Sequence, residues 1–199
     1  MKKLIAITGL DGTGKSTLLK RLKEVYSEAY FATIWDLFAA SENTSLFQSK
    51  EAIDKYICTL TPNSRLLFLM HALRFSTDKA LESEASVIIL DGYLYKYLAS
   101  ELALGADRTL AKALYNSFPT PDLTIELKTN IATAADRKQK YSHYECGITN
   151  RKGREAFINF QNRMATEWQR WRPEKCTIIN ANTSPESVFK QAKSLIDAL

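Results

Sequence analysis

The sequence predicts an α/β protein with three layers, in which helices flank a five-stranded parallel sheet on both faces. Strand-like and helix-like stretches alternate along the whole chain, and this alternation is typical of such a sheet. The length of 199 residues is enough for one domain with its own core. We therefore expect a single domain over residues 1–199, with ligands bound at the carboxyl ends of the strands.

Five apolar stretches have the composition of buried strands. The clearest is residues 86–90, because Ser-Val-Ile-Ile-Leu is rich in β-branched residues and Asp91-Gly92 follows it directly. The other four stretches are residues 3–8, 30–35, 123–127 and 177–179.

Apolar residues at helical spacing occupy most of the chain between these strands. In residues 15–27, for example, leucines recur on one side of the expected helix. Thr129 or Asn130 can cap the helix after the fourth strand, and Ser184 can cap the last helix. The remaining helices are expected over residues 45–84 with a break at 61–63, and over residues 94–104, 108–118 and 155–171.

The composition indicates an ordinary soluble domain, with 45% hydrophobic and 25% charged residues. Cys58, Cys146 and Cys176 are far apart and have no C-x-x-C spacing, so we expect neither a zinc site nor a disulfide framework. No segment approaches the roughly 18 apolar residues of a membrane helix, and the apolar run after Met1 is too short for a signal peptide. We expect a cytoplasmic protein that does not bind a membrane.

The formal net charge of +5 suits a polyanionic ligand. The basic residues are spread along the chain and form no Lys/Arg block. We therefore expect a nucleotide as the ligand and not a nucleic acid.

A glycine-rich loop follows the first predicted strand. Residues 9–16 read Gly-Leu-Asp-Gly-Thr-Gly-Lys-Ser, which is a complete Walker A pattern between a strand and a helix. Gly9, Gly12 and Gly14 allow the backbone to turn its N–H groups towards a phosphate chain. The helix that begins at Lys15 points the positive end of its dipole at the same anion. A solvated turn is the alternative, and the flanking strand and helix disfavour it.

The side chains of this loop have separate expected roles. Lys15 should reach the β- and γ-phosphates of a bound nucleotide, and the Ser16 hydroxyl should ligate Mg²⁺. Thr17 can add a phosphate contact. Asp91 ends the clearest strand, at the same edge of the sheet as the loop, and there it can hold Mg²⁺ directly or through water. The alternative for Asp91 is a turn-forming residue of an Asp-Gly pair.

These residues resemble the thymidylate kinases, a branch of the nucleoside monophosphate kinases with the P-loop NTPase fold. Residues 9–17 are similar to that family's phosphate loop, including the aspartate at Asp11. The resemblance extends over nearly the whole chain, through Asp91-Gly92-Tyr93, Pro121-Asp122-Leu123, Tyr144-Glu145, then Phe160, Arg163, Met164 and Trp168, and finally Ile179-Asn180-Ala181 followed by Ser184 and Val188.

The resemblance implies that the chain transfers the γ-phosphoryl group of ATP to a nucleoside monophosphate, in the first place dTMP, with Mg²⁺ as the metal. It also implies a lid over about residues 138–154, a polar and basic stretch that we expect to be mobile. In the family, lid arginines act when the phosphate loop carries no basic side chain, and Asp11, Gly12 and Thr13 carry none. Arg137 is then the first candidate for the catalytic arginine and Arg151 the second. Ordinary solvated charges are the alternative for both.

The acceptor residues implied by the resemblance are Asp11 for the sugar 3′-hydroxyl, Phe68 for stacking on the base, and Tyr93. A core aromatic is the alternative for Phe68. The family arginine after Asp91 is replaced by Gly92, and Lys96 is a candidate to restore its charge.

Two further departures concern the base. The family arginine that reads the base edge has no clear counterpart, and Arg74 is our choice over Arg65. Ser100 and Glu101 occupy the region that reads thymine in the family.

Two other functions stay open from the sequence. A deoxynucleoside kinase shares this general fold, and a nucleotide-binding paralogue without turnover would explain the missing arginines. Relatives in the family are commonly homodimers, and the apolar stretches 66–73 and 94–104 can supply an interface. Burial inside one chain explains the same residues equally well.

Overall fold

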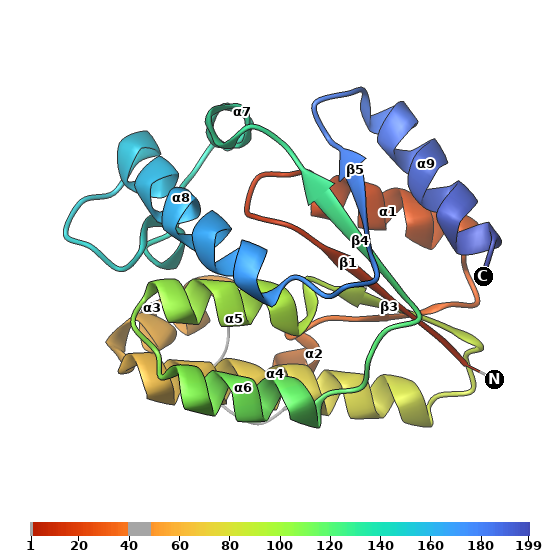
Figure 1. Cartoon of the computed structure of the whole chain (residues 1–199), viewed down its shortest axis with the longest axis horizontal. Coiled ribbons are helices and arrows are strands. Elements are labelled where there is room, and N and C mark those ends of the chain that lie inside the picture. Colours follow the sequence, from red (N-terminus) through yellow and green to blue (C-terminus); the bar gives the residue numbers. More distant parts are fainter. Residues whose placement is uncertain (1, 40–48) are drawn as a thin grey trace.

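The computed structural model describes residues 2–39 and 49–199 (Figure 1). Within these residues, five parallel strands form one sheet in the order β2-β3-β1-β4-β5. The predicted five-stranded parallel sheet is therefore confirmed. The strands are β1 Lys3–Thr8, β2 Tyr30–Ala32, β3 Val87–Asp91, β4 Leu123–Lys128 and β5 Cys176–Asn180.

Helices cover both faces of the sheet, as predicted (Figure 1). Alternate residues of β1 point to opposite faces, so that Ile5 and Ile7 pack with the first and last helices, while Leu4 and Ala6 pack with the middle helices. The helices are α1 Lys15–Val25, α2 Asp36–Ala39, α3 Lys50–Thr59, α4 Pro62–Glu82, α5 Tyr93–Ala103, α6 Arg108–Ser117, α7 Ile131–Asp136, α8 Arg154–Trp171 and α9 Pro185–Asp197, with a 3₁₀ turn, η2, at Tyr144–Cys146.

Side-chain caps fix the starts of several helices. The Asn130 side chain accepts a hydrogen bond from the N–H of Ala132, so Asn130 and not Thr129 caps α7. Ser184 caps α9 as predicted, with Pro185 in the first turn. Thr61 caps α4 in the same way, which explains the break predicted at residues 61–63.

Two stretches differ from the prediction, and one predicted helix start lies outside the described residues. The second strand ends at Ala32, because the Asp36 carboxylate accepts a hydrogen bond from the N–H of Thr33 and turns the chain into α2. The helical stretch predicted from residue 45 begins in residues outside the described part, and α3 starts at Lys50. The lid stretch contains η2, with Cys146 buried, so it has more regular structure than its polar sequence indicates.

The proposed interface stretches are largely explained by burial within the chain. In residues 66–73 and 94–104 most apolar side chains belong to the core, and Leu67, at 49% exposure, is an exception. A homodimer therefore stays a prediction without support from these residues.

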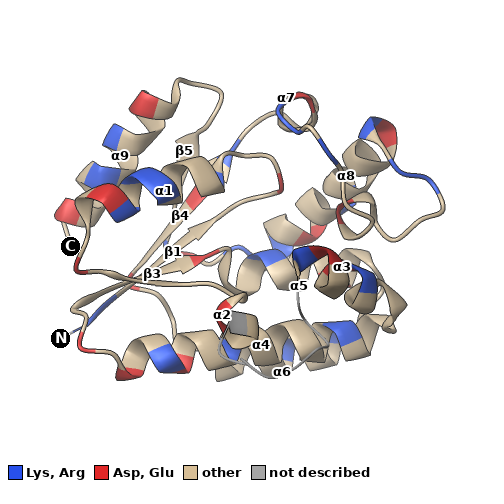
Figure 2. Ribbon diagram, turned by 180° about the vertical axis from the view of Figure 1, so that it is seen from behind, with Lys and Arg blue, Asp and Glu red and all other residues tan. Residues whose placement is uncertain are grey.

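Charged residues are distributed over the fold as they are along the sequence. Figure 2 shows Lys, Arg, Asp and Glu spread over most of the helices. None of the helices in the described ranges is long and apolar enough to cross a bilayer. All three cysteines are free thiols.

Candidate active site

The glycine loop lies between β1 and α1, where β4 and α7 crowd it. Gly9 has φ 136° and Gly12 has φ 78°, both in the left-handed region. A Cβ atom on Gly9 would lie 2.4 Å from the Leu127 carbonyl oxygen, and one on Gly12 would lie 2.5 Å from that of Ala134. Only glycine meets both the backbone angle and the space at these positions.

Helix α1 begins at Lys15 without a side-chain cap on its first N–H groups. Uncapped N–H groups at a helix start are available to an anion, and the helix dipole favours a negative charge there. The start of α1 is therefore a suitable place for phosphate.

The Lys15 ammonium group is held inside the loop. Its Nζ donates to the carbonyl oxygens of Gly9 at 2.8 Å and Leu10 at 2.7 Å. Burial, followed by the nearby charge of Lys96, lowers the pKa of Lys15 to about 8, while the charge of Asp11 opposes the shift. These carbonyl partners are neutral, so an incoming phosphate is a stronger partner for the same ammonium group.

Asp11 is fixed from two sides. Its carboxylate pairs with the Nζ of Lys96 at 2.7 Å, and its backbone N–H donates to Oε1 of Gln161 at 3.1 Å. Burial alone would raise the pKa of Asp11, but the charges of Lys96 and Lys15 outweigh it and lower this pKa to about 2. The same pairing raises the pKa of Lys96 against the effect of burial. Both groups are therefore charged at neutral pH.

Asp91 reaches the loop through the register of the sheet. In the parallel pairing of β1 with β3, Asp91 lies opposite Ile7, two residues before Gly9. The N–H of Gly92 then donates to the Ile7 carbonyl at 2.8 Å, with Gly92 at φ 85°. A Cβ on Gly92 would meet nothing closer than 3.5 Å, so the backbone angle, and not crowding, favours glycine there.

The loop opens into a cavity of about 1660 Å³. Pockets for one small ligand commonly measure roughly 300–1,000 Å³, so this one has room for two nucleotides. Its polar lining includes residues 11–17, Asp91, Lys96 and Arg137, and its apolar lining includes Trp35, Phe38, Ile53, Ile57 and Leu69.

Known proteins resemble this chain in sequence and in fold. A family model described as thymidylate kinase matches residues 7–192. The chain belongs to the thymidylate kinase family. It is 28% identical over 205 residues to a protein named "Probable thymidylate kinase 1" from Saccharolobus solfataricus. The aligned region covers 98% of this chain and 97% of that protein.

Solved structures share the fold of this thymidylate kinase family member. A thymidylate kinase from Candida albicans matches with a TM-score of 0.72 and 17% identity, over 99% of this chain and 92% of that one. A deoxyadenosine kinase from M. mycoides matches with a TM-score of 0.67 and 18% identity, over 98% and 99%. At these identities the likeness is evidence for the fold alone.

The structure brings most of the predicted site residues together in this family member. The cavity is lined by Asp11, Gly12, Thr13, Gly14, Lys15, Ser16, Thr17, Asp91, Lys96 and Arg137. Arg137 donates from its guanidinium to the Ala181 carbonyl at 2.8 Å. Lys138 also lines the cavity and pairs with Glu145 at 2.7 Å.

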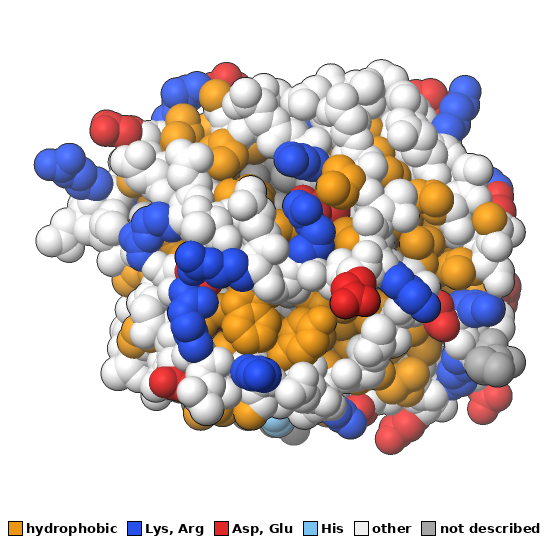
Figure 3. Space-filling view, in the orientation of Figure 1, with side chains coloured by type: hydrophobic (Ala, Val, Ile, Leu, Met, Phe, Trp, Pro, Cys, Tyr) orange, Lys and Arg blue, Asp and Glu red, His pale blue; other side chains and the backbone are white. Residues whose placement is uncertain are grey.

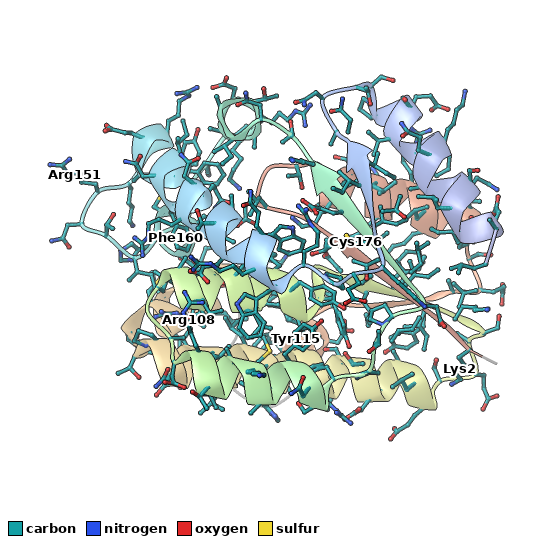
Figure 4. All side chains as sticks on the ribbon, viewed as in Figure 1. Lys2, Arg108, Tyr115, Arg151, Phe160 and Cys176 are labelled. Carbon is teal, nitrogen blue, oxygen red and sulfur yellow. The ribbon has the colours of Figure 1, made fainter. Side chains whose placement is uncertain are left out.

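Arg74, Tyr93 and Arg151 lie away from the cavity. The Arg74 guanidinium is exposed and binds the carboxylate of Asp78 and the carbonyl of Ser117. Arg151 lies at the outer part of the loop before α8, and Figure 4 shows its side chain pointing away from the protein. The lid curves outward at this point, so its basic residues do not all face the cavity.

Tyr93 and Phe68 are packed against other rings. Tyr93 is fully buried, and its hydroxyl donates to the Pro119 carbonyl at 2.5 Å. The ring centroid of Phe68 lies 5.9 Å from that of Phe38 and 5.3 Å from that of Tyr56, and Phe68 does not line the cavity. Phe68 is half-buried, and base stacking by Phe68 stays a prediction, while Phe38, which packs against it, lines the cavity.

Sequence reasoning missed Gln161, the partner of Asp11. Gln161 is fully buried on α8, next to the buried Phe160. A polar residue on the buried side of an amphipathic helix usually has a hydrogen-bond partner, and that was the available signal.

Proposed function

We propose that this chain phosphorylates dTMP, by transferring the γ-phosphoryl group of ATP to the 5′-phosphate of the acceptor. The observation that carries the proposal is that one cavity is lined by the glycine loop, including Asp11, and beyond the loop by Lys96 and apolar side chains. Its size suits a donor and an acceptor together. The names of the relatives supply the identity of the acceptor.

In the proposed reaction, an oxygen of the acceptor phosphate attacks the γ-phosphorus of ATP, the bond to the β-phosphate oxygen breaks, and ADP leaves. Both reactants are anions, so catalysis depends on positioning and on neutralising charge. Lys15 and the start of α1 hold the donor phosphates. Arg137 is the proposed arginine for the transferred group, since it lines the cavity and its guanidinium donates to the neutral carbonyl of Ala181.

Mg²⁺ is the proposed metal. Among residues 2–39 and 49–199, no group of three or more His, Cys, Asp or Glu side chains could hold a metal ion without other ligands. Mg²⁺ is commonly bound through one or two carboxylates together with phosphates and water, so Ser16 and Asp91 fit that donor set. When bound with ATP, the ion would neutralise phosphate charge.

Lys96 is the proposed cation for the acceptor phosphate, in place of the arginine that Gly92 replaces. Its pairing with Asp11 keeps it charged and holds its Nζ at the cavity. We propose that Asp11 contacts the sugar 3′-hydroxyl, and that the wall with Trp35, Phe38 and Leu69 contacts the base. Lysine binds phosphate as a point charge without the two-pronged geometry of arginine.

A panel of acceptors tests the proposal. Purified protein with Mg-ATP should form ADP in the presence of dTMP and much less in the presence of thymidine or other nucleosides. Activity with nucleosides alone would indicate a deoxynucleoside kinase, and ATP binding without acceptor-dependent ADP would indicate a paralogue without turnover. Lys15→Ala should lower turnover roughly 100-fold or more. Lys190→Ala, on the exposed face of α9, is the matched control and should leave turnover unchanged.

We also propose a cytoplasmic location, since the three free thiols suit a reducing compartment. The expectation that no nucleic acid is bound stays a prediction. On the face in Figure 3, Lys and Arg side chains are interspersed with acidic and hydrophobic ones and do not form a continuous stripe.

A further inference from the structure

A buried hydrogen-bonded network lies behind the cavity, where the lid meets helices α4 and α5. Arg65 and Glu101 form an ion pair with Nε 2.7 Å from Oε2, and their side chains are 3% and 0% exposed. The Tyr144 hydroxyl of η2 donates to the other oxygen of Glu101 at 2.7 Å and lies 2.5 Å from the Ser100 hydroxyl. Tyr144 lines the cavity, whereas Arg65, Ser100 and Glu101 do not.

The network continues to the helix that forms part of the apolar wall. The Arg65 guanidinium donates to the carbonyl oxygens of Leu60 at 2.8 Å and Ile57 at 3.4 Å, at the end of α3. The last carbonyls of a helix lack partners within it, and a cation there is favoured by the helix dipole. Tyr144 is thus connected through Glu101 and Arg65 to α3, whose Ile53 and Ile57 line the cavity.

Glu101 depends on these donors. A carboxylate removed from water needs both an opposite charge and hydrogen bonds to its oxygens. Burial raises the pKa of Glu101, and Arg65 opposes this effect. Burial, followed by the charge of Glu101, raises the pKa of the Tyr144 hydroxyl well above its usual value, so this hydroxyl keeps its proton as a donor at neutral pH. Moving η2 away would therefore remove a donor from a buried carboxylate.

We propose that Tyr144 is a positioning residue that locks the lid onto α5 and, through Glu101 and Arg65, onto the acceptor wall formed by α3. The lock is made by side chains of this chain alone, and it shapes the acceptor side of the cavity more than the donor side. The donor side is built by the glycine loop, which shares no residue with the network. The expected change in acceptor KM rests on the proposed function. The expected attachment of the lid rests on the contacts alone.

The kinetic test compares Tyr144→Phe with Tyr26→Phe. Tyr26 is the matched control, because its hydroxyl also binds a carboxylate, Asp197 at 2.5 Å, and it lies away from the cavity. Losing a hydrogen bond to a charged group corresponds to about a tenfold effect or more. We expect Tyr144→Phe to raise the acceptor KM about tenfold while the ATP KM changes less than about twofold. Equal changes in both KM values, or none, would overturn the proposal.

A double variant tests whether Tyr144 acts through Glu101. Glu101→Gln keeps an oxygen for the tyrosine but removes the charge that pairs with Arg65. If the two residues act as one unit, the double variant should raise the acceptor KM little more than the larger of the single changes. Fully additive changes would contradict the connection.

Limited trypsin digestion tests the lock without any turnover. The lid carries Lys138, Lys140, Arg151 and Lys152 as cleavage sites. In the ligand-free protein, Tyr144→Phe should speed cleavage within residues 138–152 severalfold, and Tyr26→Phe should not. An unchanged cleavage rate would refute the lock even if dTMP is phosphorylated. Faster cleavage in a protein that phosphorylates no acceptor would support the lock and reject the proposed function separately.

Discussion

The pair formed by Asp11 and Lys96 leads to a quantitative prediction about stability. Lowering the pKa of the Asp11 carboxyl from 3.8 to about 2 corresponds to roughly 2 kcal/mol of stabilisation of the folded state by the carboxylate. Because the folded pKa is below the unfolded one, this stabilisation is fully present above about pH 4. It is lost as the pH falls through about 2.

Lys96→Met removes the main partner of this carboxylate. The Nζ–Oδ1 contact of 2.7 Å disappears, and burial then acts on Asp11 with much less opposition. We expect the free energy of unfolding at pH 7 to fall by about 2 kcal/mol or more, measured by urea denaturation of the ligand-free protein. Asp11→Asn in the same background should restore part of the loss, because it removes the unpaired buried charge.

Asp136→Asn is the control for this experiment. Asp136 also pairs with a cation, Arg154 at 2.8 Å, but both side chains are exposed, so its removal should leave stability at pH 7 unchanged within error. If Lys96→Met has no larger effect than Asp136→Asn, or if the double variant is less stable than Lys96→Met, the electrostatic reasoning about this site is refuted.

Three further predictions concern the donor side. Gly9→Ala places a Cβ 2.4 Å from the Leu127 carbonyl at a φ of 136°, so it should weaken ATP binding and lower stability by roughly 1–3 kcal/mol, measured by nucleotide titration and thermal unfolding. The pKa of Lys15 is about 8 in the free protein, and a bound phosphate favours the charged form of this lysine. Binding of metal-free ATP near pH 8 should therefore be accompanied by uptake of a proton by Lys15, and ATP should bind more weakly as the pH rises towards 9. Calorimetry in buffers of different ionisation enthalpy measures this proton uptake, and a binding enthalpy that is the same in all buffers would contradict it. Arg137→Met should lower kcat roughly 100-fold, whereas Arg151→Met should leave kcat within about twofold, and equal losses in the two variants would reject the assignment.

The sequence was sufficient where one local pattern dictates one structure. The glycine loop and the strand before Asp91 were predicted because a φ above zero and a buried β-branched run each leave few alternatives. Residues that follow a strand at its carboxyl end are placed near one another by the topology alone, and Asp91 reaches the loop in this way.

The acceptor side could not be predicted from local patterns. A helix such as α4 carries apolar residues around much of its surface. Spacing alone therefore does not show which of its side chains face the cavity and which pack against other rings, as Phe68 does against Phe38 and Tyr56. The Arg74 side chain was equally ambiguous, because its partner Ser117 comes from a different helix.

The polar contacts beneath the site are pairs between distant parts of the chain. Asp11 and Gln161 are separated by 150 residues, and Arg65 and Glu101 by 36. The sequence shows that such residues are polar but not which of them meet. Their partners follow only from the packing of α4 on α5 and of α8 beside the glycine loop.

The measurement that tests the central claim most directly is the identity and stoichiometry of the products formed from ATP and dTMP. With Mg²⁺ present, we predict that one dTDP and one ADP form for each dTMP consumed. The nucleotides in samples taken over time are separated and quantified to measure this ratio. The account is contradicted if ADP forms at the same rate without dTMP, if no dTDP accumulates, or if thymidine is converted to dTMP while dTMP itself is left unchanged.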